Sequence, residues 1–448
     1  MRTNCYYACM KRTLILDCNN MVDEDVTICG WVQVRRDHGK ILFLDVLDRS
    51  ATIQVVIGGG KGHDLRPQDV VCIKGKVNKR PEHMVNNNIP TGEIEIYSEE
   101  VEVLSKAEEL PFDLGMKELD LQLPTLLDFR TLTLRHPKIK QIFKVQEAIL
   151  EGFRKAAKNI DCVEIVVPTI VAGATEGGAQ VFKIDYYEHK AYLSQSPQLY
   201  KQMLVPTFER VFTITKAYRA EPSVTTRHLS EITQMDCEIG FAEFDELLDL
   251  LEKVGTETLK FAEENSEDIL KEYGIEKIAF GKIPRLTLRE AQEIILKEFG
   301  RDNKKEKDLT PQDEIDICKW SKVKHNSDFV TITHFPTSAK PFYTHPDPKD
   351  PEYSLSYDLL FRGVEVMSGS QRINDYQQLL DSIKSRGMDP KNFEMYLQAF
   401  KFGMPSEGGF SFGLERLTMH MLNLTNIREA SLFPRDMERV DIRLSTKE

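Results

Sequence analysis

Hydrophobic and polar residues alternate with period two in five short stretches between residues 22 and 105. The stretches are VTICGWVQVRR, KILFLDVLD, ATIQVVIG, DVVCIKGKVNKR and TGEIEIYSEEVEVL. Alternation of this kind is typical of strands with one buried face. Five such strands close together predict a small Greek-key barrel of the OB type, a fold that commonly binds oligonucleotides. We therefore expect residues 1–105 to form an OB-fold domain, with a leader of uncertain role at 1–21.

The pattern changes after residue 105. Residues 106–130 are punctuated by proline and predict a hinge. Beyond the hinge, HPKIKQIFKVQEAILEGFRKAAKNI and EFDELLDLLEKVGTETLKFAEENSEDILKEYG have helical spacing, whereas RVFTITKAYRAE, DFVTITHFP and SLSYDLLFRGVEVMSG read as strands. Strands joined by hairpins with helices grouped around them predict an α+β domain with an antiparallel sheet over 131–448. The charged, mixed range at about 270–330 is expected to be a small insertion.

One predicted hairpin carries both signs of charge on a single face. Its first arm places Val211, Thr213, Thr215, Ala217, Arg219 and Glu221 on one side, and Pro222 ends the arm. On the return arm Gln234, Asp236 and Glu238 share one face, and Met235, Cys237 and Ile239 share the other. This pattern predicts a polar floor for a ligand that is both anionic and cationic. The alternative is a solvated face with ordinary cross-strand ion pairs.

Composition narrows the classes of protein that remain. The chain has 448 residues, 41% of them hydrophobic and 29% charged. No apolar run approaches the roughly 18 residues of a membrane span, and the N-terminus has no apolar core of signal-peptide type. The eight cysteines form no C-x-x-C pair, which argues against a zinc site and for a reduced, cytoplasmic protein without a membrane partner. Neither G-x-G-x-x-G nor G-x-x-x-x-G-K-[ST] occurs, so a Rossmann or P-loop nucleotide site is not expected.

The net charge of −12 is distributed unevenly. Residues 1–98 hold 13 Lys/Arg and 12 Asp/Glu, a balance of +1, which leaves −13 for the remainder. The barrel is therefore the better place for a polyanion contact. Phe43 and Gln54 lie on adjacent predicted strands and Glu93 opens the last one, which suits stacking on single-stranded RNA and reading of its base edges. The alternative is that Phe43 belongs to the core.

Two further stretches carry candidate chemistry. In YDLLFRGVEVMSGSQRIND, Asp358 and Glu365 flank a tight turn, and paired carboxylates could hold Mg²⁺ beside phosphates. The alternative is two unrelated surface carboxylates. In GGFSFGLERLTM a glycine-rich strand precedes a helix with Arg416, which could stack on a flat ring or meet phosphate, or form a salt bridge at the helix end.

Together these stretches resemble the class II aminoacyl-tRNA synthetases. VEIVVPTI resembles the first class motif, whose proline lies at a dimer interface, the charged hairpin resembles the second motif, and GFSFGLERLTM the third. Within the aspartate, asparagine and lysine subgroup, the match is to the aspartyl-tRNA synthetase family of archaeal and eukaryotic type. It rests on ATEGGA, QSPQLYKQ, YRAE…TTRHLSE, AKPFY, SGSQRI and NIREASLFPRD and covers about residues 22–438.

The resemblance implies a homodimer that uses L-aspartate, ATP, Mg²⁺ and tRNA(Asp). Its implied nucleotide contacts are Arg219, Glu221, Arg227, His228, Glu365 and Arg416. Arg219 and Arg416 are the implied catalytic residues, with Arg219 on the α-phosphate and Arg416 on the γ-phosphate or the adenine face. Its implied amino-acid contacts are Glu176, Gln198, Lys201, Asp236, Tyr343 and Arg372, with Lys201 and Arg372 on the side-chain carboxylate. Its implied magnesium ligands are Asp358, Glu365 and Ser368, and its anticodon contacts are Phe43, Gln54 and Glu93.

The chain departs from the family pattern at several positions. Asn374 replaces a histidine, Ser411 replaces a glycine beside the adenine, and Gln33 stands where Trp or His is usual. Two alternatives to an aspartate enzyme remain. One is an asparaginyl-tRNA synthetase, against which Lys201 argues, and the other is an OB-fold RNA-binding protein with a catalytically dead synthetase domain.

Overall fold

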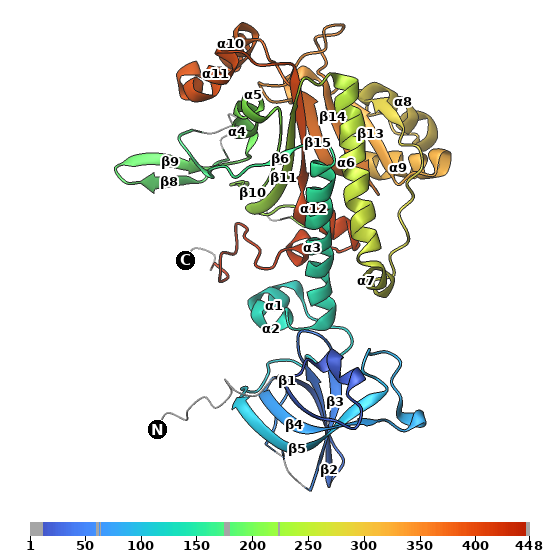
Figure 1. Cartoon of the computed structure of the whole chain (residues 1–448). Helices are drawn as coiled ribbons and strands as arrows, with labels where there is room; N and C mark the ends of the chain where they lie inside the picture. The colour runs from blue at the N-terminus through green and yellow to red at the C-terminus, as the bar shows by residue number, and fades with distance from the viewer. Residues whose placement is uncertain (1–11, 60–61, 63, 174–179, 223–224, 445–448) are drawn as a thin grey trace. The chain divides into compact units, whose positions relative to one another are not determined.

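A computed structural model of the chain describes residues 12–59, 62, 64–173, 180–222 and 225–444. The chain divides into two compact units, Met1–Gln122 and Leu123–Glu448 (Figure 1). The boundary between them falls within the segment 106–130 that the sequence predicts as a hinge. Among the described residues, no helix is both long enough and apolar enough to cross a bilayer.

The first unit is a closed five-stranded barrel. Its strands follow the order β1-β2-β3-β5-β4, with only β3 and β5 running parallel. Their bounds are β1 Asp25–Asp37, β2 Ile41–Leu47, β3 Thr52–Gly58, β4 Val70–Lys79 and β5 Ile94–Ser105, and two short 3-10 helices, η2 Ile15–Asn20 and η3 Glu82–Met84, accompany them. The predicted OB-fold barrel is confirmed.

Period-two alternation divides the barrel strands into an inner and an outer face. On β2, Leu42, Leu44 and Val46 are buried inside the barrel. Phe43 lies between them in sequence, is only partly buried and is not part of that core. The alternative that assigned Phe43 to the core is therefore wrong, because its side chain belongs to the outer face.

The second unit is built on an eight-stranded sheet. Its order is β12-β13-β14-β15-β16-β11-β10-β6, and all neighbours are antiparallel except the edge pairs β12–β13 and β10–β6. The bounds are β6 Val163–Glu164, β10 Arg210–Tyr218, β11 Glu231–Gly240, β12 Arg285–Thr287, β13 Phe329–Thr333, β14 Ser356–Phe361, β15 Val364–Gln371 and β16 Glu407–Gly413. A smaller sheet holds β7 Ile170–Val171, β9 His189–Leu193 and β8 Lys183–Tyr186. The predicted α+β class is confirmed.

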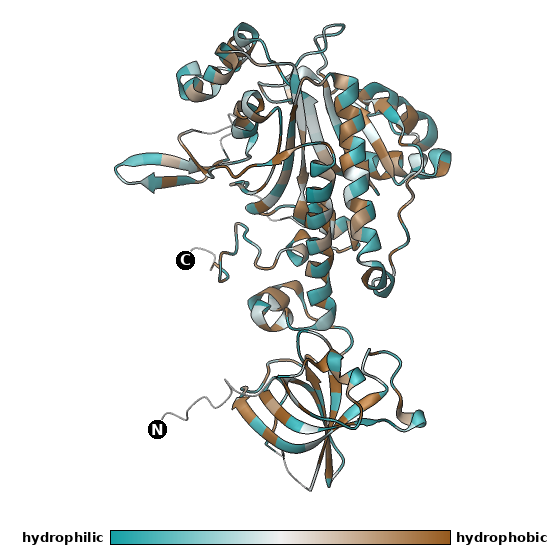
Figure 2. Ribbon diagram, in the orientation of Figure 1, coloured by the Kyte–Doolittle hydropathy of each residue, from teal (hydrophilic) through white to brown (hydrophobic). Residues whose placement is uncertain are grey.

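Three helices cover one face of the large sheet. They are α3 Pro137–Lys158, α6 Phe244–Glu264 and α12 Leu414–Met421 (Figure 1). Figure 2 shows hydrophobic and hydrophilic residues interleaved along α3 and α6, and their apolar sides join the sheet in one core. Phe153 and Leu251 from the helices meet Met235 and Cys237 from β11 there. The helices thus take the apolar face of β11 and leave its polar face for a site.

Further helices surround this layer. They are α1 Leu123–Asp128, α2 Arg130–Thr133, α4 Gln198–Met203, α5 Val205–Phe208, α7 Glu267–Glu272, α8 Leu288–Phe299, α9 Pro311–His325, α10 Tyr376–Ser385, α11 Glu394–Lys401, η4 Thr337–Ala339, η5 Pro390–Phe393 and η6 Ile427–Ala430. Capping boxes at Thr287 and Thr310 begin α8 and α9. The range 270–330, predicted as an insertion, supplies these two helices and the edge strand β12 of the large sheet.

Candidate active site

The polar floor predicted from the charged hairpin is present on β11. In the β10–β11 pairing Thr213 lies opposite Asp236, and Gln234 lies opposite Thr215. On the other side of β11, Ser411 of β16 is the partner of Asp236, and its hydroxyl donates to Asp236 Oδ1 at 2.7 Å. Ser411 therefore orients the Asp236 carboxylate on this polar floor.

Two adjoining cavities of about 200 Å³ each open over this floor. They share Arg219, Gln234, Ser368 and Ser411. The first, which we call the lysine cavity, is also lined by the predicted residues Gln198, Lys201, Asp236, Tyr343 and Arg372. The second, which we call the histidine cavity, is also lined by the predicted residues Glu221, Arg227, His228, Glu365 and Arg416. The structure thus gathers two chemically different groups of predicted residues into neighbouring cavities, with Arg219 between them.

A buried network of ion pairs closes the lysine cavity. Lys201 is 1% exposed, and its Nζ lies 2.9 Å from Asp236 Oδ2 and 3.0 Å from Glu238 Oε2. Burial alone would lower the pKa of Lys201, but the two carboxylates outweigh it and hold that pKa above its ordinary value. Lys201 is therefore a charged lysine on the hidden face of α4.

The second cation of the network is Arg372. Its Nε donates to Glu238 Oε1 at 2.8 Å, and its guanidinium carbon lies 5.2 Å from the centre of the Tyr343 ring. Burial would raise the pKa of Glu238, but Arg372 and then Lys201 outweigh it and lower that pKa to about 2. Glu238 is thus the shared counterion of both cations, a role that the sequence analysis did not assign.

Two further buried residues, Glu407 and Gln202, complete the network, and the sequence analysis did not identify either of them. Glu407, at the start of β16, is fully buried, and Gln202 Nε2 donates to its Oε1 at 2.7 Å. Burial, and next the neighbouring Glu238, raise the pKa of Glu407 well above its ordinary value. No local pattern marks Glu407, because only the pairing of β16 with β11 and β15 brings it beside Glu238.

The histidine cavity is suited to an anion with a polar ring. Arg219, Arg227 and Arg416 line it together, and guanidinium groups bind phosphate oxygens in a planar, bidentate way. His228 Nε2 lies 3.3 Å from Glu221 Oε2, so these two predicted residues act as one pair. Arg416 Nη1 lies 3.8 Å from Glu365 Oε1.

A β-bulge places the predicted carboxylates on one face. The turn at Arg362 and Gly363 has positive φ values of 47° and 89° and joins β14 to β15. Asp358 is the partner of Ser368, but the register shifts between Leu359 and Leu360, so that Glu365 becomes the partner of Leu360. Glu365 and Ser368 are three residues apart, so strict alternation would place their side chains on opposite faces of β15. The extra residue of the bulge, which lies between them, places both side chains on the same face.

These residues fit a hard divalent cation. Asp358 is buried, and its Oδ1 has no hydrogen-bond partner among the described residues, while Lys340 Nζ lies 3.3 Å from its Oδ2. Burial, and next Asp358, raise the pKa of Glu365 to about 7. Within the described part of the chain no three acidic, His or Cys side chains converge on a complete metal site. A cation here would therefore need further oxygen ligands, such as phosphate oxygens.

One more carboxylate near this position was not predicted. Glu314 lies on α9, and burial followed by the charge of Glu365 raises its pKa to about 7, with Arg227 and Arg416 acting in the opposite sense. No sequence pattern indicated Glu314, because α9 lies in the range expected to be an insertion. Glu176, predicted to contact an amino group, lies in 174–179, outside the described residues.

The barrel carries its own polar cluster on the outer face. Arg36 donates to both carboxylate oxygens of Asp45 at 2.9 and 2.7 Å and to Gln54 Oε1 at 3.2 Å. Gln54 Nε2 in turn donates to Glu95 Oε2 at 2.7 Å. Of the predicted anticodon residues, Gln54 is therefore already engaged within the barrel. Glu93 is exposed in the turn before β5 and lies outside this cluster.

Phe43 is adjacent to the same cluster. It is the strand partner of Arg36 across β1 and β2, and its ring makes an edge contact with His38 at 5.5 Å between centroids. An outward-facing aromatic ring beside a cation is the arrangement that stacks on single-stranded bases.

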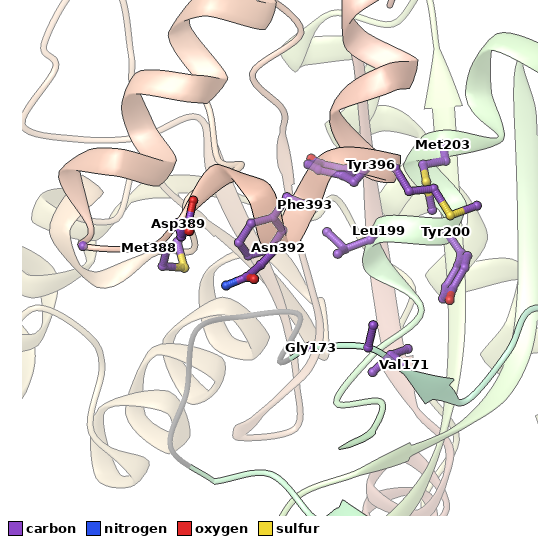
Figure 3. Close-up of a pocket in the computed structure, with 13 residues that line it drawn as sticks. Val171, Gly173, Leu199, Tyr200, Met203, Met388, Asp389, Asn392, Phe393 and Tyr396 are labelled. Atoms are coloured by element: carbon purple, nitrogen blue, oxygen red, sulfur yellow. The ribbon is translucent and has the colours of Figure 1, made fainter. Parts of the chain in front are cut away.

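A larger cavity of about 510 Å³ lies against a different face of α4 (Figure 3). Leu199, Tyr200 and Met203 of α4 line it together with Phe393 and Tyr396. Its lining is mainly apolar, and none of the predicted site residues that the structure describes lies among the residues lining it.

Comparison with known proteins gives two family matches. Residues 122–437 match the tRNA synthetases class II (D, K and N), and residues 26–104 match the OB-fold nucleic acid binding domain. The two matched ranges correspond to the two compact units of the structure.

Individual proteins of known name match over nearly their whole length. The chain is 40% identical to an aspartate–tRNA(Asp/Asn) ligase of Thermus thermophilus, over 96% of this chain and 99% of the relative. It is 38% identical to an aspartate–tRNA(Asp) ligase of Pyrococcus horikoshii, over 93% and 95%.

Solved structures agree with these matches. The asparaginyl-tRNA synthetase of Pyrococcus horikoshii complexed with asparaginyl-adenylate superposes with a TM-score of 0.87 at 29% identity, covering 96% of this chain and 99% of that one. A putative aspartyl-tRNA synthetase from Leishmania major gives a TM-score of 0.88 at 27% identity, covering 98% and 96%. The two motif-bearing cavities, the barrel and these matches lead to one conclusion: the chain belongs to the class II tRNA synthetases of the aspartate, lysine and asparagine group.

Proposed function

We propose that the protein is an aspartate–tRNA ligase. It activates L-aspartate with ATP to give aspartyl-adenylate and pyrophosphate, and then transfers the aspartyl group to the 3′ end of tRNA(Asp). The full-length relatives named as aspartate–tRNA ligases support this function. Among the observations on the chain itself, the one that carries the proposal is the pair of buried cations, Lys201 and Arg372, at the closed end of the lysine cavity.

The first step is an in-line displacement at phosphorus. An oxygen of the aspartate α-carboxylate attacks the α-phosphorus of ATP, and pyrophosphate leaves, so the chain must mainly position the reactants and balance their charge. Arg219 lies between the two cavities and would hold the α-phosphate at the point of attack. Arg416 and Arg227 would bind the departing phosphates, and Glu221 with His228 would hold the adenine.

The amino acid is placed in the lysine cavity by opposite charges. Lys201 and Arg372 would receive the side-chain carboxylate of aspartate, and Tyr343 would cover it. Asp236 and Gln198 would bind its ammonium group, together with Glu176. Each cation is already paired with Asp236 or Glu238, so aspartate would join an ordered network.

A magnesium ion completes the proposed chemistry. Asp358, Glu365 and Ser368 would hold it, and Mg²⁺ supplies neutralisation of the charge that develops on the phosphates. The unpartnered Oδ1 of buried Asp358 supports this assignment.

Charge also argues against the asparagine alternative. Lys201 and Arg372 can each donate a charge-assisted hydrogen bond to a side-chain carboxylate, and such bonds contribute about 1.5–3 kcal/mol each, more than bonds to a neutral amide. A catalytically dead RNA-binding protein is not favoured either, because Arg219, Arg416, Asp358 and Glu365 are all present and gathered at the two cavities or beside them.

The proposal is tested by ATP–pyrophosphate exchange in the absence of tRNA. We expect exchange that depends on aspartate, with asparagine weaker by about 10²-fold or more. Equal exchange with both amino acids would contradict aspartate selection, and no exchange with either would contradict the ligase assignment.

The tRNA partner requires a separate measurement. Relatives are named both as aspartate–tRNA(Asp) and as aspartate–tRNA(Asp/Asn) ligases, and we propose tRNA(Asp) for this chain, read by Phe43, Gln54 and Glu93. Charging of tRNA(Asp) and tRNA(Asn) transcripts at one salt concentration gives the ratio of kcat/KM. Comparable values for the two would show that the enzyme does not discriminate.

We further propose a cytoplasmic homodimer. The segment around β6 and β7 exposes apolar side chains, with Val166 97% exposed and Val163 and Ile170 nearly half exposed. Such a strip at a sheet edge is suited to a second copy of the chain. Sedimentation velocity should give twice the monomer mass, and Val166→Asp should shift the species toward the monomer.

A further inference from the structure

Glu407 is a fully buried carboxyl group beside residues that line the lysine cavity. It is 0% exposed at the first position of β16. The charged and titratable groups around it come from every neighbouring element: Glu238 from β11, Arg372 after β15, Tyr357 from β14 and Tyr396 from α11. A carboxylate in such a place needs a partner for each oxygen.

The hydrogen bonds around Glu407 leave one oxygen without a donor. Gln202 has its Oε1 occupied by the Tyr396 hydroxyl at 3.1 Å and by Gln198 Nε2 at 3.0 Å. Its amide nitrogen is therefore the group that faces Glu407 Oε1, at 2.7 Å. Glu407 Oε2 has no donor among the described residues.

The group that interacts with Glu407 on its other side is another carboxylate. The side chains of Glu238 and Glu407 lie within reach of a mutual hydrogen bond, and two carboxylates can share one only if one of them carries a proton. Glu238 is bound by Arg372 and Lys201, which hold it in the charged form. The proton therefore resides on Glu407.

We propose that Glu407 is a neutral carboxylic acid that donates its proton to Glu238, and that this proton makes Glu407 a specificity-determining positioning residue for aspartate. It touches no substrate and acts through Glu238 and Arg372. The inference rests on the proposed function, because it concerns how the same cavity selects its amino acid.

The proton sets the net charge that a ligand meets. With Glu407 neutral, Lys201 and Arg372 balance Asp236 and Glu238, so this group of side chains has no net charge. With Glu407 ionised, the same group would carry one negative charge, which opposes the carboxylate of a ligand and tolerates an amide. A protonated Glu407 therefore favours aspartate over asparagine.

The direction of the pH dependence follows from the same balance. The raised pKa of Glu407 keeps the proton in place at neutral pH. Aspartate selection is therefore complete below that pKa and weakens as the pH rises through it. The tyrosines nearby are neutral in this range, since burial raises the pKa of both Tyr357 and Tyr396.

The first experiment reads the proton directly. We expect the infrared difference spectrum between wild type and Glu407→Gln at neutral pH to show the carbonyl stretch of one protonated carboxylic acid that is lost in the variant. Glu407→Leu should lose the same band and serves if the glutamine variant folds poorly. Loss of a carboxylate band instead would overturn the proposal, whatever the enzyme's activity.

The second experiment measures selection. Glutamine offers one oxygen to Gln202 and one N–H to Glu238, which is the pattern of the neutral acid. Glu407→Gln should therefore keep the ratio of aspartate to asparagine kcat/KM in exchange within about threefold at neutral pH, and the decline of that ratio at alkaline pH should disappear. Glu407→Leu should raise the aspartate KM about 10–100-fold and leave the ATP KM unchanged.

The outcomes separate this inference from the proposed function. If Glu407 were ionised, Glu407→Gln would remove one negative charge beside the cavity. The ratio of aspartate to asparagine kcat/KM would then shift about tenfold or more toward aspartate, which would refute the proposal. Glu394→Gln, the same change at an exposed position of α11, is the control and should alter neither measurement. An absence of exchange in the wild type would refute the ligase function and leave the infrared result to decide the proton.

Discussion

Two polar clusters of similar composition occur in the two units of this chain, and they differ in their access to water. On the barrel, Arg36 pairs with Asp45, with side chains that are 42% and 24% exposed. In the synthetase unit, Lys201 and Glu238 form an ion pair with 1% and 0% exposed. Both clusters combine a cation, carboxylates and a glutamine, so composition alone does not distinguish them.

Because the two clusters differ in burial, we expect them to have different roles. An exposed pair contributes about 0–1 kcal/mol, is screened by salt and can exchange its partner for another charged group. A buried pair contributes little net stability, but removing one partner costs about 3–5 kcal/mol. The barrel cluster is thus suited to rearrange around RNA, whereas the buried network is suited to reject a ligand of the wrong charge.

Removing a cation from the buried network should give the largest effect. Lys201→Met leaves Asp236 and Glu238 with less positive charge and should reduce aspartate-dependent exchange about 10²–10⁴-fold, while narrowing the gap to asparagine. The ATP KM should stay close to that of the wild type. Lys216→Met, which removes an exposed lysine paired with Glu231, is the matched control, and near wild-type exchange by the Lys201 variant would show that the carboxylate binds elsewhere.

The proposed metal carboxylates combine a buried side chain, Asp358, with a partly exposed one, Glu365. Asp358→Asn and Glu365→Gln should each lower exchange about a hundredfold at ordinary Mg²⁺ concentration, because neutral amides hold the cation less well. Circular dichroism and sedimentation should match the wild type. Asp350→Asn, at an exposed position, controls for the change itself, and exchange at the wild-type rate in both variants would remove these residues from the magnesium site.

Phe43→Ala tests the outer face of the barrel. Stacking of a base on an aromatic ring is worth about 1–3 kcal/mol, so kcat/KM for tRNA should fall about 5–150-fold. Exchange without tRNA should be unaffected, since the ring lies outside the barrel core. Phe402→Ala, at an exposed ring of the other unit, should leave charging unchanged, and equal losses of exchange and charging in the Phe43 variant would indicate a structural role.

The smallest effect is expected from the exposed ion pair. Arg36→Gln should lower the free energy of unfolding by about 1 kcal/mol or less, and the difference should shrink at high salt. Urea unfolding at low and high ionic strength measures both. A salt-independent loss of 3 kcal/mol or more would mean that the barrel cluster behaves like the buried network, and the comparison between the two units would fail.

Simple periodicity accounts for much of the fold. Alternation of period two identified the five barrel strands and placed Gln234, Asp236 and Glu238 on one face of β11, because each strand has one apolar neighbour layer. Helical spacing likewise identified α3 and α6. In these elements the hydrophobic periodicity depends only on residues close together in the chain, so one sequence is enough to identify the element and its buried face.

What the sequence did not reveal depends on contacts between distant strands. Burial, and next Glu238, which is 169 positions away in the chain, raise the pKa of Glu407, and burial, and next Glu365 of β15, raise the pKa of Glu314. The dual role of Glu238 as counterion was also hidden, because alternation gives the face of a residue but not its partner. Such residues need the sheet order before they can be recognised.

The β-bulge of the β14–β15 hairpin limits how this part of the chain can change during evolution. Its single extra residue reverses the parity of β15, so that Glu365 faces the same way as Ser368. Regular pairing of the present residues, without the bulge, would turn Glu365 toward the helices, whereas loss of one residue between Glu365 and Ser368 would restore regular pairing and leave both on the same side. Descendants of this sequence can thus lose the extra residue without moving Glu365 to the other face, but regular pairing at the present length would preserve the fold and separate the two proposed magnesium ligands.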